Sequence, residues 1–465
     1  MNSILQLKGR FEQRSNRSRP GSPKLPKGKS VSASHLRELE KQLERILVYW
    51  TENKDIRGAL VSVHYKHIVA KSNRLKILLS ENGKSPTESI RGAKFVWEPD
   101  QKGNEVQKHV FTHFVSLQAI EKSIDVLKKT ASIIEQYYKG SVPSEVIEEL
   151  GEKYHFNEVP KTSFLKTVVD GFYVERFDID RATEEITEEA IITIYQTGVD
   201  TKRLLSKFGI DIVDDRIIDG TTLRLNPDEV KLLYNNASYL IAMGVTDFSE
   251  ISRDDVLDAY EDMEEDAGLL IPHPQNEPVI GVIDTQFNEK VYFHEWVEYK
   301  NLLDPNIPLS RKDYEHGTAV SYIIVDGPQG NPELADGCGR FRVRHFGVAT
   351  NNGFSSFTVL KMIRNIVASN RDIKVWNLSL GSKLEIKANF ISPEAAELDR
   401  IQSEYDVIFV VAGTNIPAGV TKKNMRIGSP ADSLNSMVVN AVDFAGNSAS
   451  YTRIGPVLSF FHKPD

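Results

Sequence analysis

The chain has 465 residues, of which 40% are hydrophobic, and this length predicts about two or three domains with sizeable cores. The net charge of −8 gives no overall signal for nucleic-acid binding. The single cysteine, Cys338, excludes a disulfide framework within the chain and fits a reducing cytoplasm. We interpret Cys338 as a buried structural thiol.

The beginning of the chain has no secretory signal, and no apolar stretch reaches the length of a membrane span. The sequence therefore predicts a soluble cytoplasmic protein. Residues 1–33 are rich in Arg, Lys, Ser, Pro and Gly, and they cannot bury enough apolar surface to offset the entropy of ordering. We interpret them as a disordered basic tail that is solvated, in preference to one that contacts nucleic acid or an acidic partner.

Residues 34–180 have the pattern of an α+β domain. Apolar side chains at helical spacing predict one helix after Ser34 and a longer one over residues 118–138, and strand-like runs occur at residues 59–63, 76–79 and 109–115. His109 and His113 are four positions apart, but they lie within a predicted strand, so we do not favour a metal pair. The sequence assigns no chemistry to this domain.

Residues 185–252 predict a second, smaller α+β domain. Strands are expected at residues 190–195, 217–225 (two strands around an Asp-Gly turn) and 239–245, with helices at 201–209 and 227–236. This order is typical of a ferredoxin-like, split βαβ unit. Residues 253–275 follow as an acidic linker, which we interpret as an exposed domain boundary and a plausible cleavage region.

Residues 276–465 predict an α/β domain. A continuous apolar run at residues 278–285 ends on Asp284, and two similar runs end in the loops at residues 379–381 and 413–415. Helical patterns separate these strands, which predicts a doubly wound parallel sheet with its strand ends gathered on one edge. A single Asp at a strand end more often caps the next turn, so Asp284 needs support from other residues.

His316 provides such support. It begins an apolar run that predicts a helix, and the dipole at a helix start opposes protonation of the imidazole. A general base must be neutral, so His316 is suited to that role. Asp284, Asn415 and the loop of Ser379, Leu380 and Gly381 all lie at strand ends, and we expect them at the same edge of the sheet.

Taken together, these motifs resemble the subtilisin-like serine proteases, the subtilase family. Val-Ile-Asp-Thr at residues 282–285 resembles the aspartate motif, and His-Gly-Thr-Ala-Val at 316–320 the histidine motif. Asn-Leu-Ser-Leu-Gly at 377–381 resembles the substrate-lining segment, and Val-Ala-Gly-Thr-Asn at 411–415 the oxyanion motif. Residues 428–431, 438–443 and 449–456 resemble later parts of the same domain.

The resemblance implies a serine endopeptidase that acts on a peptide or protein substrate. Asp284 would orient His316, His316 would act as general base and acid, and Asn415 would stabilise the oxyanion. Ser379, Leu380 and Gly381 would pair with the substrate backbone as an added strand. The resemblance also implies that residues 185–252 form an inhibitory propeptide, which is processed at the acidic linker. The alternative is that these residues form a docking module.

The sequence predicts no metal, cofactor, nucleic acid or membrane partner, and it gives no oligomeric state. Calcium is common in the family, but no convincing carboxylate loop is present.

Three positions depart from the family pattern. Gln286 stands where glycine is usual, and Ala319 stands where a second histidine is frequent. Thr414 separates Gly413 from Asn415, so either the Thr414 hydroxyl or the Asn415 amide is the oxyanion donor; we favour Asn415.

The nucleophile is the largest departure. The family carries its serine in a Gly-Thr-Ser motif, and residues 416–465 contain no such motif. We therefore interpret residues 276–465 as a subtilase domain that is incomplete at its C-terminus, with its serine beyond residue 465. The alternatives are a non-catalytic pseudoprotease that binds peptides and an adaptor that recruits a partner.

Overall fold

A computed structural model of the chain describes residues 24–246 and 271–464, apart from short gaps at 82–83, 100–102, 151–153, 183–185, 187, 352–354, 383, 388–390, 417–424, 443–444 and 459–460. The chain divides into two compact units. One is formed mostly by residues before 244 and the other mostly by residues after 244. No helix in the described residues is long and apolar enough to cross a membrane.

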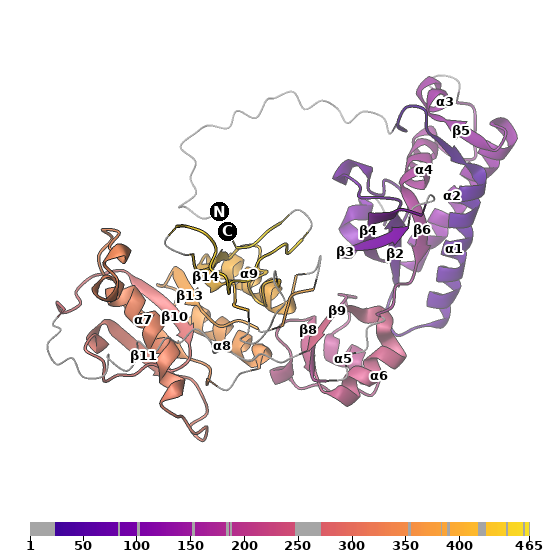
Figure 1. Ribbon diagram of the computed structural model, residues 1–465. Helices are drawn as coiled ribbons and strands as arrows, with labels where there is room; N and C mark the ends of the chain where they lie inside the picture. The colour runs from indigo at the N-terminus through magenta and orange to yellow at the C-terminus, as the bar shows by residue number, and fades with distance from the viewer. Residues whose placement is uncertain are drawn as a thin grey trace. The chain divides into compact units, whose positions relative to one another are not determined.

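The unit after residue 244 contains a six-stranded sheet in the order β11-β12-β10-β13-β14-β15, and every neighbouring pair is parallel (Figure 1). The strands are β10 (Val279–Asp284), β11 (Val297–Asn301), β12 (Arg342–Gly347), β13 (Val375–Leu378), β14 (Ile408–Ala412) and β15 (Met437–Val439). The predicted doubly wound parallel sheet is confirmed.

Strand β10 lies at the centre of this sheet because its residues suit burial on both faces. Val282 and Ile283 are completely buried. Gly281 lies against the ring of Trp376 on β13, so that a Cβ atom there would overlap the ring. Trp376 in turn stacks on Phe409 of β14, with ring centroids 6.2 Å apart.

Helices cover both faces of the sheet. On one face, α7 (Lys312–Gly330) contributes Val325 to an apolar cluster with Val282 and Phe287. On the other face are α8 (Ser356–Ser369) and α9 (Pro393–Tyr405), which lie side by side. Serine side chains cap both α8 and α9 by accepting hydrogen bonds from their first turns.

The other unit contains a four-stranded antiparallel sheet in the order β3-β4-β2-β6. The strands are β2 (Ala59–Tyr65), β3 (Ile90–Pro99), β4 (Glu105–Val115) and β6 (Val174–Asp178). The helices are α1 (Ala33–Glu52), α2 (Leu117–Tyr137), α3 (Ser144–Glu149) and α4 (Lys161–Tyr173). Helices α1 and α2 pack together through the apolar faces that their sequences predict.

Two predictions for this unit need correction. Residues 24–33 are not a disordered tail, because Ser30–Ser32 form β1 and pair with β5 (Ser141–Pro143); residues 1–23 lie outside the described part. Residues 76–79 are not a strand. The Asp170 carboxylate accepts hydrogen bonds from the amides of residues 76, 77 and 78, at 2.8, 2.9 and 3.0 Å, and holds them in a loop.

Residues 190–246 form a three-stranded sheet in the order β8-β7-β9. Its elements are β7 (Ala190–Ile194), α5 (Thr201–Ser206), β8 (Thr222–Leu225), α6 (Pro227–Ala237) and β9 (Ile241–Thr246). The strand predicted before the Asp-Gly turn is absent: Asp214–Arg216 form a 3₁₀ turn, and the Asp219 carboxylate accepts hydrogen bonds from Thr221. The described part of this domain therefore has three strands where four were expected. Residues 253–270 of the predicted linker lie outside the described part.

The predicted burial of Cys338 is wrong, because its thiol is exposed. Gly337 and Gly339 on either side adopt left-handed backbone conformations, with φ of +81° and +80°. These glycines turn the chain at the surface, which leaves the sulfur in solvent.

Candidate active site

The register of the sheet brings the predicted site segments to one edge. Asp284, the last residue of β10, is opposite Gly347 on β12. On the other side, Ile283 is opposite Leu378, and Leu378 is opposite Val411. The loops that follow β10, β13 and β14 therefore begin next to one another at the C-terminal edge, as predicted for an open parallel sheet.

Asp284 and His316 are in direct contact. His316 Nδ1 lies 2.6 Å from Asp284 Oδ1, and the amide of Thr285 donates to the same oxygen at 2.6 Å. The Asp284 side chain is completely buried, whereas that of His316 is 24% exposed. The other oxygen, Oδ2, is buried and has no hydrogen-bond partner within the described residues. The pair thus joins a buried carboxylate to an imidazole that solvent can reach.

The environment of Asp284 keeps its carboxylate ionised. Burial alone would raise the pKa of Asp284, but the charge and the hydrogen bond of His316 outweigh it and leave the pKa below its ordinary value. An ionised carboxylate can only accept, so the proton of the imidazole must lie on Nδ1 of His316. The lone pair is then on Nε2, which is the arrangement that a general base requires.

Tight packing behind His316 fixes this geometry. A Cβ atom on Gly317 would lie 2.7 Å from the Gln286 carbonyl and 2.8 Å from both the Thr285 carbonyl and His345 Cε1. The Gly317 amide donates to Thr285 Oγ1 at 2.9 Å. Only glycine therefore allows α7 to approach the end of β10 this closely.

A second histidine lies beneath the pair and was not predicted. His345 on β12 is completely buried, and its Nε2 donates to the Thr285 carbonyl at 2.8 Å. Its Nδ1 accepts from Ser321 Oγ of α7, 2.9 Å away. Burial lowers the pKa of His345, so this imidazole is neutral and serves to join β12, β10 and α7. No sequence motif marks it, because its partners are distant in the chain.

Gln286, the departure from the family's glycine, has a packing role. Its side chain is completely buried; Nε2 donates to the Ala349 carbonyl at 2.9 Å, and Oε1 accepts from Tyr299 Oη at 2.6 Å. Gly347 leaves room for the amide, because a Cβ atom there would overlap it. Gln286 thus ties the loop after β10 to β11 and β12.

The loop after β13 packs against the loop after β14. Leu380 is buried, and Ser379 Oγ donates to Asn377 Oδ1 at 3.0 Å. Gly381 lies so close to Thr414 that a Cβ atom would overlap the threonine methyl. The loops at residues 379–381 and 413–415 are therefore neighbours.

Thr414 and Asn415 differ in the hydrogen bonds already made. Thr414 has φ of +68°, which is strained for a β-branched residue. Its hydroxyl donates to the Gly413 carbonyl at 2.6 Å and accepts from the Gly428 amide at 2.9 Å. The side-chain amide of Asn415 makes no hydrogen bond to the described residues. This geometry favours Asn415 as the available donor.

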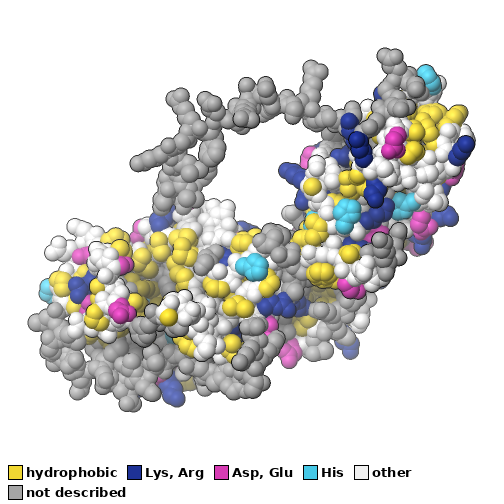
Figure 2. Space-filling view, turned by 45° about the horizontal axis from the view of Figure 1, so that its top comes forward, with side chains coloured by type: hydrophobic (Ala, Val, Ile, Leu, Met, Phe, Trp, Pro, Cys, Tyr) yellow, Lys and Arg dark blue, Asp and Glu magenta, His cyan; other side chains and the backbone are white. Residues whose placement is uncertain are grey.

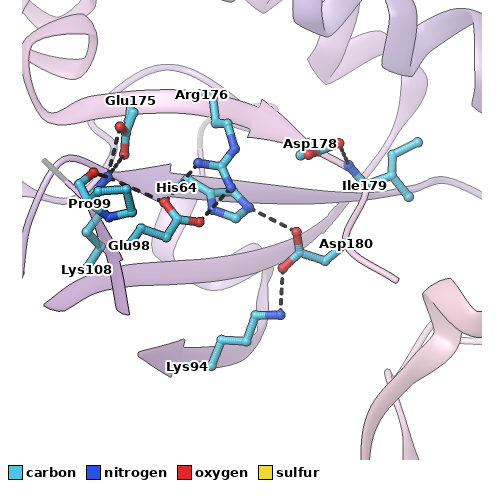
Figure 3. Close-up of polar contacts among 10 residues, drawn as sticks. All are labelled: His64, Lys94, Glu98, Pro99, Lys108, Glu175, Arg176, Asp178, Ile179 and Asp180. Atoms are coloured by element: carbon cyan, nitrogen blue, oxygen red, sulfur yellow. Dashed lines mark hydrogen bonds and ion pairs between the residues drawn. The ribbon is translucent and has the colours of Figure 1, made fainter. Parts of the chain in front are cut away.

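The described residues contain one group with the spacing of a metal site, and it lies in the other unit. His64, Asp178 and Asp180 cluster at the β2–β6 edge (Figure 3). However, the Lys94 ammonium lies 2.7 Å from Asp180 Oδ2, and His64 Nε2 lies 2.9 Å from Oδ1. A lysine thus occupies the place of a cation, and we assign no metal to this cluster.

Comparison with known proteins identifies the domain that holds the Asp–His pair. Residues 275–465 match the model of the subtilase family, peptidase S8. Over these residues, which are less than half of the chain, the protein is similar to the subtilase family of serine proteases. No curated protein matches the chain.

Solved structures similar to the chain include three proteases. The prenylagaramide maturation protease PagA is 17% identical with a TM-score of 0.29, covering 39% of this chain and 59% of PagA. The patellamide maturation protease PatA is 16% identical with a TM-score of 0.28, covering 39% and 62%. The epidermin leader peptide processing protease EpiP of Staphylococcus aureus is 16% identical with a TM-score of 0.34, covering 58% and 73%. The chain thus spans about three fifths of the length of PagA and PatA.

Proposed function

We propose that this protein is a serine endopeptidase of the subtilisin type, in which Asp284 and His316 activate a serine encoded beyond residue 465. The observation that carries the proposal is the 2.6 Å contact between the buried Asp284 carboxylate and the partly exposed His316 imidazole. Within a subtilase domain, such a pair at the C-terminal edge of a parallel sheet is suited to acyl transfer.

In the proposed reaction, His316 Nε2 takes the proton of the serine hydroxyl while the serine oxygen attacks the peptide carbonyl. The imidazole becomes positively charged, and Asp284 stabilises that charge. His316 then gives the proton to the leaving amine, and water repeats the sequence to release the acyl group.

Two further segments complete the proposed site. The amide of Asn415 would donate to the oxyanion, an interaction worth about 3–4 kcal/mol in known cases. The backbone of Ser379, Leu380 and Gly381 would bind the substrate as an added strand. The buried position of Leu380 supports this role, because it anchors the segment to the domain core.

The experiment that tests the proposal uses the complete coding sequence, read past residue 465 for a Gly-Thr-Ser motif. The protein that carries this motif should hydrolyse an unstructured protein such as casein. His316→Ala should lower kcat greatly, since removal of the equivalent histidine in subtilisin costs about 2 × 10⁶-fold. Asp284→Asn should lower kcat by about 10⁴-fold, because it changes the tautomer of His316.

A matched control is His294→Ala, which alters a histidine of the same domain whose Nδ1 contacts the Val291 carbonyl, 3.0 Å away. It should leave kcat within about twofold of the parent enzyme, as expected for a residue away from the reacting groups. A complete protein that binds casein without cleaving it would support the pseudoprotease alternative and exclude the protease.

We also propose that residues 185–252 act as an intramolecular propeptide. Their position directly before the subtilase domain, and the acidic linker between the two, support this role. Mass spectrometry of the complete protein should find cleavage within residues 253–275, and His316→Ala should abolish it. Cleavage that persists in His316→Ala would instead indicate an external protease.

A further inference from the structure

The unit before residue 244 contains a cavity with no part in the proposed protease chemistry. Its volume is about 880 Å³, and its charged and titratable lining residues are Lys29, His35, Lys66, His67, Lys108 and Glu175. Three lysines and two histidines thus face one carboxylate. On the visible face of this unit, Lys and Arg side chains lie beside His side chains (Figure 2).

The single carboxylate is already neutralised. Lys108 is buried, and its ammonium contacts both oxygens of Glu175, at 2.8 and 3.0 Å (Figure 3). Glu98 lies 3.4 Å from the same ammonium and forms a two-point ion pair with Arg176, at 2.9 and 3.1 Å. The two positive charges of Lys108 and Arg176 equal the two negative charges of Glu175 and Glu98. This wall of the cavity is therefore held in place by ion pairs and has no net negative charge.

Lys66 and Lys29 are not held by ion pairs in this way, although the charge of Glu175 acts on Lys66 and raises its pKa against the effect of burial. The Lys66 ammonium donates to the Phe172 carbonyl, at 2.8 Å, at the end of α4. Neither Lys66 nor Lys29 forms an ion pair with a carboxylate of the described residues. Burial lowers the pKa of Lys66, and burial together with the charge of Lys66 lowers the pKa of His35. An anion in the cavity would relieve both effects.

The start of α1 adds to the positive potential of the cavity. Ser32 caps this 20-residue helix by accepting from the His35 amide at 3.2 Å, and both residues line the cavity. The first turn of α1 contains no acidic side chain to offset the dipole. The N-terminus of a helix and nearby lysine ammonium groups both attract phosphate groups.

We propose that this cavity binds a nucleoside phosphate. The volume lies within the range of about 300–1,000 Å³ that is typical of small-molecule sites, which favours a compact ligand over a polymer. Lys29 and Lys66 bind the phosphates, and the dipole of α1 adds positive potential, because the amides of Ala33 and His35 already donate to the Gly140 carbonyl and to Ser32 Oγ. The ring of Phe172, which also lines the cavity, offers an apolar surface for the base. Neither the protease proposal nor the family assignment is needed for this inference.

Isothermal titration calorimetry of the full chain tests whether the cavity binds a nucleoside phosphate, with ATP, pyrophosphate and adenosine as probes. ATP should bind with one site per chain, and pyrophosphate more weakly. Adenosine alone should bind at least about tenfold more weakly than ATP, because the phosphates supply the charge-assisted contacts. Raising the salt concentration should weaken ATP binding.

Two variants remove the proposed phosphate contacts. Lys66→Gln should weaken ATP binding by about tenfold or more, since charge-assisted hydrogen bonds to phosphate are lost. Because Lys66 also contacts α4, Lys29→Glu is the second variant: this lysine is exposed, so its replacement should leave the thermal unfolding midpoint unchanged while weakening ATP binding similarly. Lys128→Glu, an exposed lysine on α2 outside the cavity, is the charge-matched control.

Three results would overturn the inference. They are no ATP binding at millimolar concentration, equal ATP affinity in Lys29→Glu and Lys128→Glu, or adenosine binding as tightly as ATP. A single-stranded oligonucleotide that binds the cavity far more tightly than ATP, and loses affinity in Lys66→Gln, would replace the small-molecule ligand by a polymer and also reject the proposal.

Discussion

At the scale of single residues, the Asp284–His316 contact depends on the space left by Gly317. Gly317→Ala places a methyl group 2.7–2.8 Å from two backbone carbonyls and His345, and neither backbone can yield without moving β10 or α7. We expect a loss of about 1–3 kcal/mol in the free energy of unfolding of the subtilase domain, typical of overpacking. Urea unfolding of this domain, followed by hydrogen exchange in β10, measures it.

Gly220→Ala is the control for this substitution. Gly220 has no heavy atom within 4 Å of the Cβ position, so an alanine there should change the free energy of unfolding by less than about 0.5 kcal/mol. If Gly317→Ala were as harmless as Gly220→Ala, the close approach of α7 to β10 would be wrong.

The residues that make direct contacts in the site were easier to predict than those that support them. Asp284 and His316 could be predicted because each has a local signal: Asp284 ends an apolar strand, and His316 lies near the start of α7, which begins at Lys312. The sequence marks Gln286 only as a departure from a motif, and it does not mark His345 at all. Their roles come from contacts with Tyr299, Ala349 and Ser321, which are far away in the sequence. Local patterns do not encode such pairings.

At the scale of elements, the sequence pattern predicted the strands with apolar residues but not the strands that contain charged residues. Strand β14 is apolar throughout, β10 is apolar up to Asp284, and β13 has only Asn377 among apolar residues, a pattern typical of strands covered on both faces. Strand β12 does not, because Arg344 interrupts it. Arg344 pairs with Glu298 of β11 at 2.7 Å and with Asp372 at 3.1 Å, so its charge is neutralised within the sheet. Only the folded arrangement shows that this segment can be a strand.

The segment at residues 76–79 was predicted as a strand but forms a loop. Its apolar residues suit a strand, but Asp170 offers its amides a carboxylate. Asp170→Ala should leave three amides without a partner and destabilise this unit by about 2–4 kcal/mol, since each hydrogen bond to a charged group contributes about 1.5–3 kcal/mol and water replaces part of it. Hydrogen exchange at residues 76–78 should accelerate strongly.

Asp178→Ala provides the matched comparison for Asp170→Ala. Asp178 is exposed, and its carboxylate accepts a hydrogen bond from the amide of the next residue, Ile179. Its replacement should leave exchange at residues 76–78 unchanged. Unaltered exchange in Asp170→Ala as well would mean that another group holds this loop.

At the scale of the whole molecule, each compact unit buries a neutral histidine. In one unit, Ser89 Oγ donates to the Pro86 carbonyl, so His113 Nδ1 must donate to Ser89 Oγ, 2.9 Å away. Its Nε2 is buried and has no hydrogen-bond partner within the described residues. Burial lowers the pKa of His113 from 6.5 to about 3. In the subtilase domain, burial likewise lowers the pKa of His345.

These histidines predict that both units lose stability in mild acid. The unfolded chain takes up a proton at each histidine near pH 6.5, whereas folded His113 does so only near pH 3. The free energy of unfolding of the unit that holds His113 therefore falls as pH is lowered through this interval, by up to about 1.4 kcal/mol per pH unit. The lowered pKa of His345 acts in the same direction in the subtilase domain, below pH 6.5. His113→Asn should flatten the pH dependence of hydrogen-exchange protection in β4 and leave that of β10 unchanged, while His345→Asn should do the reverse. If either substitution flattened both profiles, the two units would unfold together and the division of acid sensitivity between them would be wrong.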